Sequence, residues 1–380
     1  MEDPMRTNRT RCIPMTSKLA RATALVAMNL VLATSAIGQT TTMPLSTIEA
    51  ASIGGTQHSQ ITSFVDHWGQ RASGTDAQQA SRAQTKLLEP LINSRVSIAF
   101  RSSYSDALGS YFDTLESTGD IGSTFSALRL AGELGTARST KIIMKGLDSD
   151  DAGVRIFAAG RAGRTFRTTA ANGPALPAND LTALITKLSS ITKSSDDQYL
   201  ISACVQSLGA GCSLPSKDFL NARAQCLAAM CDAASAQLIA ADSDLESRVR
   251  LAMLGSGAAT NSLLQIGEDS TNAAVKSAVA LGADMISVAL SEVINGTMPS
   301  TDNRELYISL VRSGESLLYF ALRENAELKR KPVGNVQQTA FADLLQAGKD
   351  RDFRNQAALL LGAGSPIITE FGFTDDRFVN

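Results

Sequence analysis

The stretch that decides the fold is ALRLAGELGTARSTKIIMKGLDSDDAGVRIFAAGRAG, residues 127–163. Its apolar residues predict one helix that ends at Gly135 and a second helix that carries Ile142 and Ile143. An Asp-rich turn follows, and the next helix has its expected end at Gly163, 28 residues after Gly135. A short helical pair cannot bury its apolar face alone, so we expect such pairs to stack side by side.

The same pattern recurs along the chain. The helix ending is a leucine followed by glycine, at 208–209, 254–255, 281–282 and 361–362. The helix opening is an apolar residue followed by a basic one, at 154–155, 249–250, 275–276 and 353–354, with an alanine a few positions later. We expect the alanine to let a neighbouring helix come close, and the glycine to end the helix in a left-handed conformation.

This pattern resembles the short HEAT-like repeats first described in phycobilisome lyases. The resemblance is strongest over residues 124–164, degenerate over 196–290 and weaker at 340–364. It implies an all-α fold, a right-handed α-solenoid of stacked antiparallel helix pairs. It also implies a concave surface that binds another protein or a peptide. Such repeats serve many roles, so the resemblance specifies architecture better than function.

The N-terminus is typical of an export signal. Lys18 and Arg21 precede an uncharged stretch, 22–38, whose end, Ala36-Ile37-Gly38, fits the small residues at a cleavage point. Translation from Met15 would give a more regular signal than translation from Met1. We therefore expect an exported protein, periplasmic or extracellular, with no membrane span after cleavage.

The rest of the chain divides into four expected parts. Residues 39–55 are expected to be a flexible lead-in. Residues 56–120 have helical periodicity without the repeat signature, so we expect an N-terminal helical cap or module, with a helix broken near Pro90. The HEAT-like solenoid is expected at 121–364, and an extended or disordered tail at 365–380.

Four cysteines lie within 28 residues, at Cys204, Cys212, Cys226 and Cys231. An even number of cysteines in an exported protein favours disulfides. Bonds could join Cys204 to Cys226 and Cys212 to Cys231, or Cys204 to Cys231 and Cys212 to Cys226. The alternative is that some of them are buried thiols that pack between helices.

A local basic cluster is formed by Arg155, Arg161, Arg164 and Arg167. It could bind an anionic partner or a polysaccharide. It could instead neutralise the acidic turn that contains Asp148, Asp150 and Asp151, and this structural interpretation is the favoured one.

The composition gives little support for catalysis. The chain contains 2 histidines and no His-Glu dipeptide, so we expect no catalytic residues, no bound metal and no cofactor. A formal charge of −2 gives no indication of nucleic-acid binding. The sequence therefore predicts an exported, non-enzymatic interaction scaffold that holds a protein or peptide on its concave surface. The alternatives are a lyase-like or chaperone-like protein and a self-associating component of the cell envelope.

Overall fold

The computed structural model describes residues 41–240, 244–266, 271–298, 302–332, 336 and 338–378, and within these ranges the chain forms helices and no β-strand. The expected signal at 1–38, with both candidate start residues, lies outside the described residues. The elements are α2 Leu45–Ile48, α3 Gly55–Ala72, α4 Ala77–Leu88, η1 Glu89–Ile92, α5 Ile98–Ala107, α6 Gly109–Thr118, α7 Ile121–Leu134, α8 Ala137–Leu147, α9 Ala152–Asn172, α10 Ala178–Ser194, α11 Gln198–Gly211, α12 Ser216–Ile239, α13 Leu245–Ile266, α14 Asn272–Ile294, α15 Asp302–Leu328, α16 Phe341–Gln346, α17 Asp350–Leu361 and α18 Pro366–Phe371.

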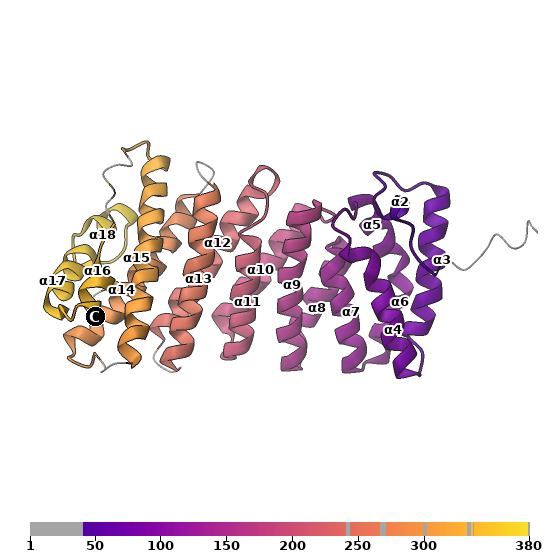
Figure 1. Cartoon of the computed structure of the whole chain (residues 1–380), viewed down its shortest axis with the longest axis horizontal. Coiled ribbons are helices and arrows are strands. Elements are labelled where there is room, and N and C mark those ends of the chain that lie inside the picture. The colour runs from indigo at the N-terminus through magenta and orange to yellow at the C-terminus, as the bar shows by residue number, and fades with distance from the viewer. Residues whose placement is uncertain are drawn as a thin grey trace, which may run out of the picture.

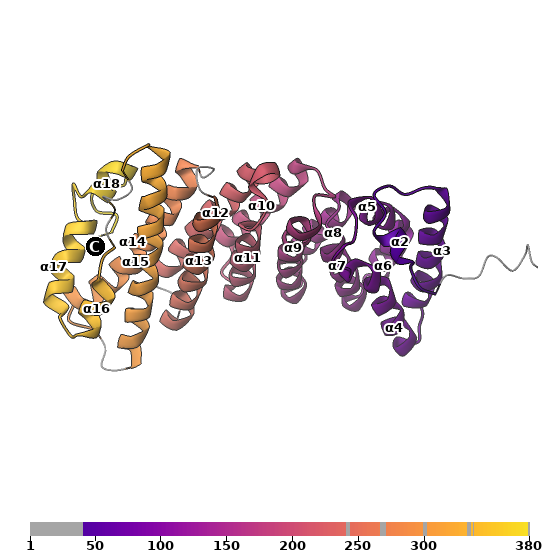
Figure 2. The same cartoon turned by 45° about the horizontal axis from the view of Figure 1, so that its top comes forward.

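From α7 onward the helices form a row of two layers (Figure 1). In one layer α7, α9, α11, α13 and α15 pack one after another, and in the other α8, α10, α12 and α14 do so, followed by α17. Figure 2 shows that the row is bent into a shallow arch. The layer with α9 and α11 lies on its inner side, so we name it the inner layer, and the layer with α8, α10 and α12 is the outer layer. The prediction of an all-α row of stacked helices is confirmed.

The helices begin where the sequence supplies capping residues. The carboxylate of Asp120 accepts a hydrogen bond from the backbone N–H of Ser123 at 2.8 Å, and that of Asp151 accepts one from Val154 at 2.8 Å. Each carboxylate satisfies a backbone donor that has no partner within the helix. The hydroxyl and backbone hydrogen bonds from Ser123 lower the pKa of Asp120 to about 2.

The first helices, α2 to α6, have their own apolar core, and α7 contributes to both cores. Ala127, Leu130 and Leu134 of α7 pack into the first core, while Leu128 and Ala131 pack into the core of the row. The expected module at 56–120 is thus helical. The helix before Pro90 is broken there as predicted, because α4 gives way to the 3-10 helix η1. Because one helix serves both cores, the module and the row form a continuous structure.

A buried arginine adds a polar connection between the module and the row. Arg101 of α5 is 0% exposed. Its guanidinium donates to the carbonyl of Leu134 at the end of α7, at 3.1 Å, and to the carbonyls of Asn172 and Gly173 at the end of α9. These carbonyls lie in the last turns of their helices, where backbone acceptors lack partners and cations are favoured.

Most of the glycines expected at helix ends have a different role. Gly163 lies inside α9, Gly209 inside α11, Gly255 inside α13 and Gly282 inside α14. A Cβ at Gly163 would lie 2.7 Å from Oγ of Ser207, and one at Gly282 would lie 3.1 Å from the carbonyl oxygen of Gly314. The left-handed helix end is therefore right at Gly135 (φ 57°), but it is wrong at these four positions and at Gly362, where φ is −74°. At Gly163 and Gly282 glycine is required because the neighbouring helix passes too close for a side chain.

Both ends of the described chain are more ordered than the sequence predicted. Within the expected lead-in, Leu45–Ile48 forms a short helix whose Ile48 is buried. Within the expected tail, Pro366–Phe371 is helical and Phe378 is 1% exposed. Apolar side chains in both segments pack onto the adjacent helices, and that burial is what orders them.

Among the described residues, one helix, α14, is long and apolar enough to cross a membrane by length and composition. No such stretch was expected outside the signal. Of the apolar window in α14, 61% is buried inside the fold, against α12 and α15.

Two glycines of α9 offer a matched test of the close approach between α9 and α11. Gly160 has no atom within 4 Å of the position that a Cβ would occupy, whereas a Cβ at Gly163 would meet Ser207. Gly160→Ala is expected to raise the free energy of unfolding by up to ~1 kcal/mol, since alanine favours helix. Gly163→Ala is expected to lower it by about 1–3 kcal/mol through overpacking. Urea denaturation followed by circular dichroism measures both, and equal effects would contradict the close approach.

The role of Arg101 can be measured against an exposed arginine of the same module. Arg101→Met takes a donor from one buried and two partly buried carbonyls, so it is expected to lower the free energy of unfolding by about 3 kcal/mol. The control is Arg95→Met, because the Arg95 side chain is 73% exposed and its ion pair with Glu49 is expected to contribute less than ~1 kcal/mol. A loss at Arg101 no larger than that at Arg95 would show that the buried hydrogen bonds have little net effect.

Candidate functional site

Four arginines gather on the inner layer, where α7 and α9 lie side by side. We name Arg129 of α7 together with Arg161, Arg164 and Arg167 of α9 the inner arginine cluster. On α9, Ala158 contacts the outer-layer helix α8 near Gly146. Arg164 and Arg167 lie on the opposite side of α9, because a helix turns by about 100° per residue. These two side chains therefore lie on the inner side of the arch.

One carboxylate lies within the cluster. Glu133 of α7 accepts hydrogen bonds from Arg164, with both Nε and Nη2 at 2.7 Å from its Oε2. Burial lowers the pKa of Arg161, and the guanidinium groups of Arg129, Arg164 and Arg167 lower it further, while Glu133 opposes the shift. Burial and Arg164 likewise lower the pKa of Arg167. Four guanidinium groups around one carboxylate leave a net charge of +3, so the cluster repels itself and attracts anions.

Aromatic side chains flank the cluster. Phe125 of α7 and Phe157 of α9 meet edge to face with ring centroids 4.9 Å apart, and the Arg161 guanidinium lies 4.6 Å from the centre of the Phe157 ring. These contacts hold Arg161 across the seam between the two helices.

The structure separates Arg155 from the other predicted arginines. Its Nη1 donates to the carbonyl of Ser149 at 2.8 Å and to that of Asp150 at 3.0 Å, in the turn between α8 and α9. Arg155 therefore has a structural contact in this turn, but the contact is with backbone carbonyls, whereas the structural interpretation named the acidic side chains. Arg161, Arg164 and Arg167 do not turn back to this acidic region but lie around Glu133.

A surface groove of about 480 Å³ lies between α11 and α13 in the same layer. Tyr199 is 79% exposed and Leu254 is 43% exposed, and Gln206 and Arg250 also line the groove. Tyr199 and Gln206 lie on the side of α11 opposite to the buried Cys204, as Arg164 and Arg167 lie opposite to the buried face of α9. Because α9 and α11 are neighbours, the cluster and the groove lie on adjacent pairs of inner-layer helices.

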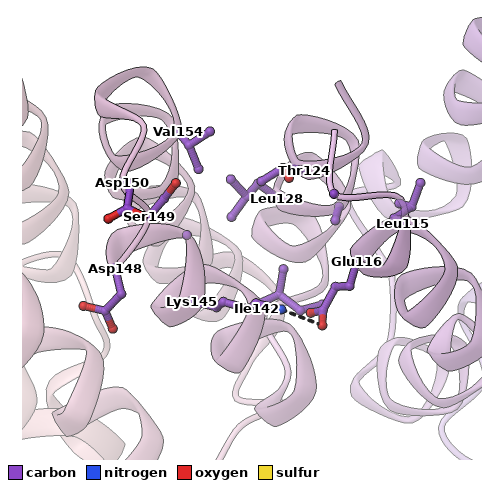
Figure 3. A pocket seen from close by; sticks show the side chains of 13 residues that line it. Leu115, Glu116, Thr124, Leu128, Ile142, Lys145, Asp148, Ser149, Asp150 and Val154 are labelled. Atoms are coloured by element: carbon purple, nitrogen blue, oxygen red, sulfur yellow. Dashed lines mark hydrogen bonds and ion pairs between the residues drawn. The ribbon is translucent and has the colours of Figure 1, made fainter. Parts of the chain in front are cut away.

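A second cavity, of about 400 Å³, opens where α6 and α8 end and α7 and α9 begin (Figure 3). Leu128 and Ile142 contribute to its apolar wall. At its rim Lys145 is paired with Glu116 at 2.9 Å, as Figure 3 shows, and Lys187 is paired with Asp148. The cavity can hold an apolar side chain, and the carboxylate of Asp150 also lines it.

The four cysteines are free thiols, so the predicted disulfides are wrong. Cys204, Cys212, Cys226 and Cys231 are all buried and unbonded. They pack between α11 and α12, and a Cβ at Gly211 would lie 2.3 Å from Sγ of Cys226. Burial raises the pKa of Cys204 and Cys212 to about 12 and that of Cys226 and Cys231 well above its usual value. These thiols are packing residues, as the alternative interpretation held.

Thiol labelling tests this assignment. In a chain with Cys12→Ser, we expect none of the four remaining thiols to react with Ellman's reagent at pH 8 under native conditions, because the reactive thiolate is absent far below a pKa of about 12. In guanidinium chloride without reductant all four are expected to react. Fewer than four reactive thiols in the denatured chain would show that a disulfide is present.

Among the residues that the structure describes, no group of three or more His, Cys, Asp or Glu side chains is arranged to hold a metal ion. The two histidines lie in α3, away from the inner arginine cluster in sequence and in the row.

Sequence reasoning missed Arg129, Tyr199 and the α11–α13 groove. Arg129 lies 32 residues before Arg161, so proximity in sequence could not include it in the basic cluster. A possible signal was its place in the preceding repeat unit, since equivalent helices of stacked units lie next to each other.

No protein-family model matches the sequence, and no curated protein matches it. Among solved structures, one engineered protein, Northeast Structural Genomics Consortium target OR329, is 16% identical over 68% of this chain and 97% of its own, with a TM-score of 0.37. Another, target OR497, is 14% identical over 88% of this chain and 93% of its own, with a TM-score of 0.29. Likenesses this distant give no information about function.

Proposed function

We propose that this chain is an exported, non-enzymatic interaction scaffold, a right-handed α-solenoid of HEAT-like helix pairs. Its inner face holds an acidic, extended segment of a partner protein. The observation that carries the proposal is the inner arginine cluster, in which Arg164 pairs with Glu133 and the charges of Arg129 and Arg167 act on nearby Arg161.

The charge of the cluster supports an anionic partner. Arg129 and Arg167 are exposed, and neither forms an ion pair within 4.0 Å among the described residues. Their charges are therefore available to carboxylates of a second molecule. A partner that pairs with them also relieves the repulsion that lowers the pKa of Arg161.

The neighbouring groove between α11 and α13 favours an extended protein segment as the ligand, in preference to a small anion. Next to the arginines on α7 and α9, the inner layer presents the exposed Tyr199 and Leu254 on α11 and α13. Glutamine and arginine side chains there can pair with polar groups of a bound chain, and Tyr199 can cover an apolar side chain.

The test uses a charge-reversed variant of the cluster. An octaglutamate peptide with an N-terminal fluorescein is titrated with full-length protein by fluorescence anisotropy at 20 and 200 mM NaCl. Arg129→Glu with Arg167→Glu is expected to weaken binding at least 10-fold, because two attractions become repulsions, and the unmodified chain should bind more weakly at 200 mM NaCl.

The control has the same net charge. Arg351→Glu with Arg354→Glu reverses two exposed arginines on α17, far along the row from the cluster. It is expected to change the affinity less than 2-fold. If both double variants lose affinity equally, the peptide responds only to net charge and the inner face is not the binding site.

A further inference from the structure

After α18 the chain turns back over the outer layer. Gly372 takes a left-handed conformation (φ 62°), which reverses the chain direction, and residues 372–378 then lie against α12 and α14. We name residues 372–378 the closing segment. Phe378 is 1% exposed and meets Phe373 edge to face at 5.1 Å between ring centroids.

The closing segment supplies the cation for a buried carboxylate. Asp284 lies in the middle of α14, the most apolar long helix of the described chain, and its side chain is 1% exposed. Its two oxygens accept from Nη1 and Nη2 of Arg377 at 2.6 and 2.7 Å, and the hydroxyl of Ser235 on α12 completes the site. This is a bidentate arginine–carboxylate pair, which fixes the orientation of the Arg377 guanidinium as well as its distance from Asp284.

A buried ion pair is a weak source of stability, because desolvation of both charges offsets their attraction. An apolar residue at 284 would pack in α14 without that penalty. The best-attested benefit of a buried ion pair is specificity, since a buried carboxylate favours a cationic partner, and a bidentate one such as arginine above all, over neutral or acidic side chains. Asp284 therefore has the properties of a recognition residue.

Two more residues of α14 contact the closing segment. The hydroxyl of Ser287 donates to the carbonyl of Phe378, and the ammonium of Lys276 lies 5.0 Å from the centre of the Phe373 ring. A cavity of about 390 Å³ adjoins Arg377 and Phe378, and Glu292 and Tyr307 also line it. The closing segment thus lies in a groove on α12 and α14, and this groove extends beyond the segment into the cavity.

We propose that this groove over Asp284 is a peptide-binding site for segments in which an arginine is directly followed by an aromatic residue. The closing segment, with Arg377 and Phe378, occupies it within the same chain until a partner segment of that kind displaces it. The site lies on α12 and α14 of the outer layer, so it is separate from the inner arginine cluster and does not depend on the function proposed for it.

The experiment uses the full chain with its own ligand disabled. Arg377→Ala with Phe378→Ala removes both recognition side chains and leaves α12 and α14 unchanged. The probe is a fluorescein-labelled peptide, GFTDDRF, which is residues 372–378 with a blocked C-terminus. It is expected to bind the double variant saturably and to bind the unmodified chain at least 10-fold more weakly, because the closing segment competes there.

Two controls show whether recognition is specific. Adding Asp284→Asn to the double variant keeps the shape of the side chain and removes its charge, and it is expected to weaken peptide binding at least 10-fold. A peptide with the arginine replaced by alanine should lose affinity to the same degree. A double variant that is helical and melts cooperatively, yet binds no peptide, would overturn the proposal.

A measurement on the unmodified chain keeps the test decisive if the double variant does not fold. Native-state hydrogen exchange is expected to show amides of the closing segment exchanging at least 100-fold faster than the core amides of α14, through opening of the segment alone. If both sets exchange at the same rate, through global unfolding only, the closing segment is a fixed part of the fold and no exchangeable site exists.

Discussion

The row depends on how closely the backbones of neighbouring helices approach. α9 meets α11 where Gly163 faces Ser207, and the Ser207 hydroxyl donates to the carbonyl of Ala159 at 2.6 Å across the seam. α14 meets α15 where Gly282 faces Gly314, with no side chain between them. Such approaches bring long stretches of helix into van der Waals contact, and they are possible only where both surfaces are made of small residues. Alanine and glycine in this chain are therefore determinants of helix packing and not merely helix formers and breakers.

The sequence predicted the architecture because the information for it is local. Apolar spacing, the Asp-rich turn before Val154 and the recurrence of the Leu-Gly pair all lie within one or two helices. The same local reasoning assigned Gly163 and Gly282 to helix ends, since a glycine in a single sequence has the same appearance at a terminus and at a seam. Distinguishing the two requires knowledge of the facing residue, and Gly314 lies 32 residues after Gly282.

The candidate site was predictable only in part, for a related reason. Three of its arginines share α9 and could be grouped from the sequence, but the position of Arg155 is set by the carbonyls of the turn, which a charge pattern does not reveal. For the cysteines, the sequence led to a wrong prediction, because it assigned bonds to residues whose role is packing. Their even number and expected export favoured bonds, whereas the narrow space beside Gly211 explains a thiol at Cys226 as a small apolar side chain.

The Arg101 contacts have a mechanical consequence. This one side chain holds the ends of α7 and α9, which lie 33 and 71 residues further along the chain. Tension applied between the two ends of the arch would pass from the first module into α7 and α9, the first two helices of the inner layer, at once, instead of being taken up by a single seam. The load is shared there, so under stretching we expect the seam between α9 and α11, which this side chain does not span, to give way before the seam between α7 and α9.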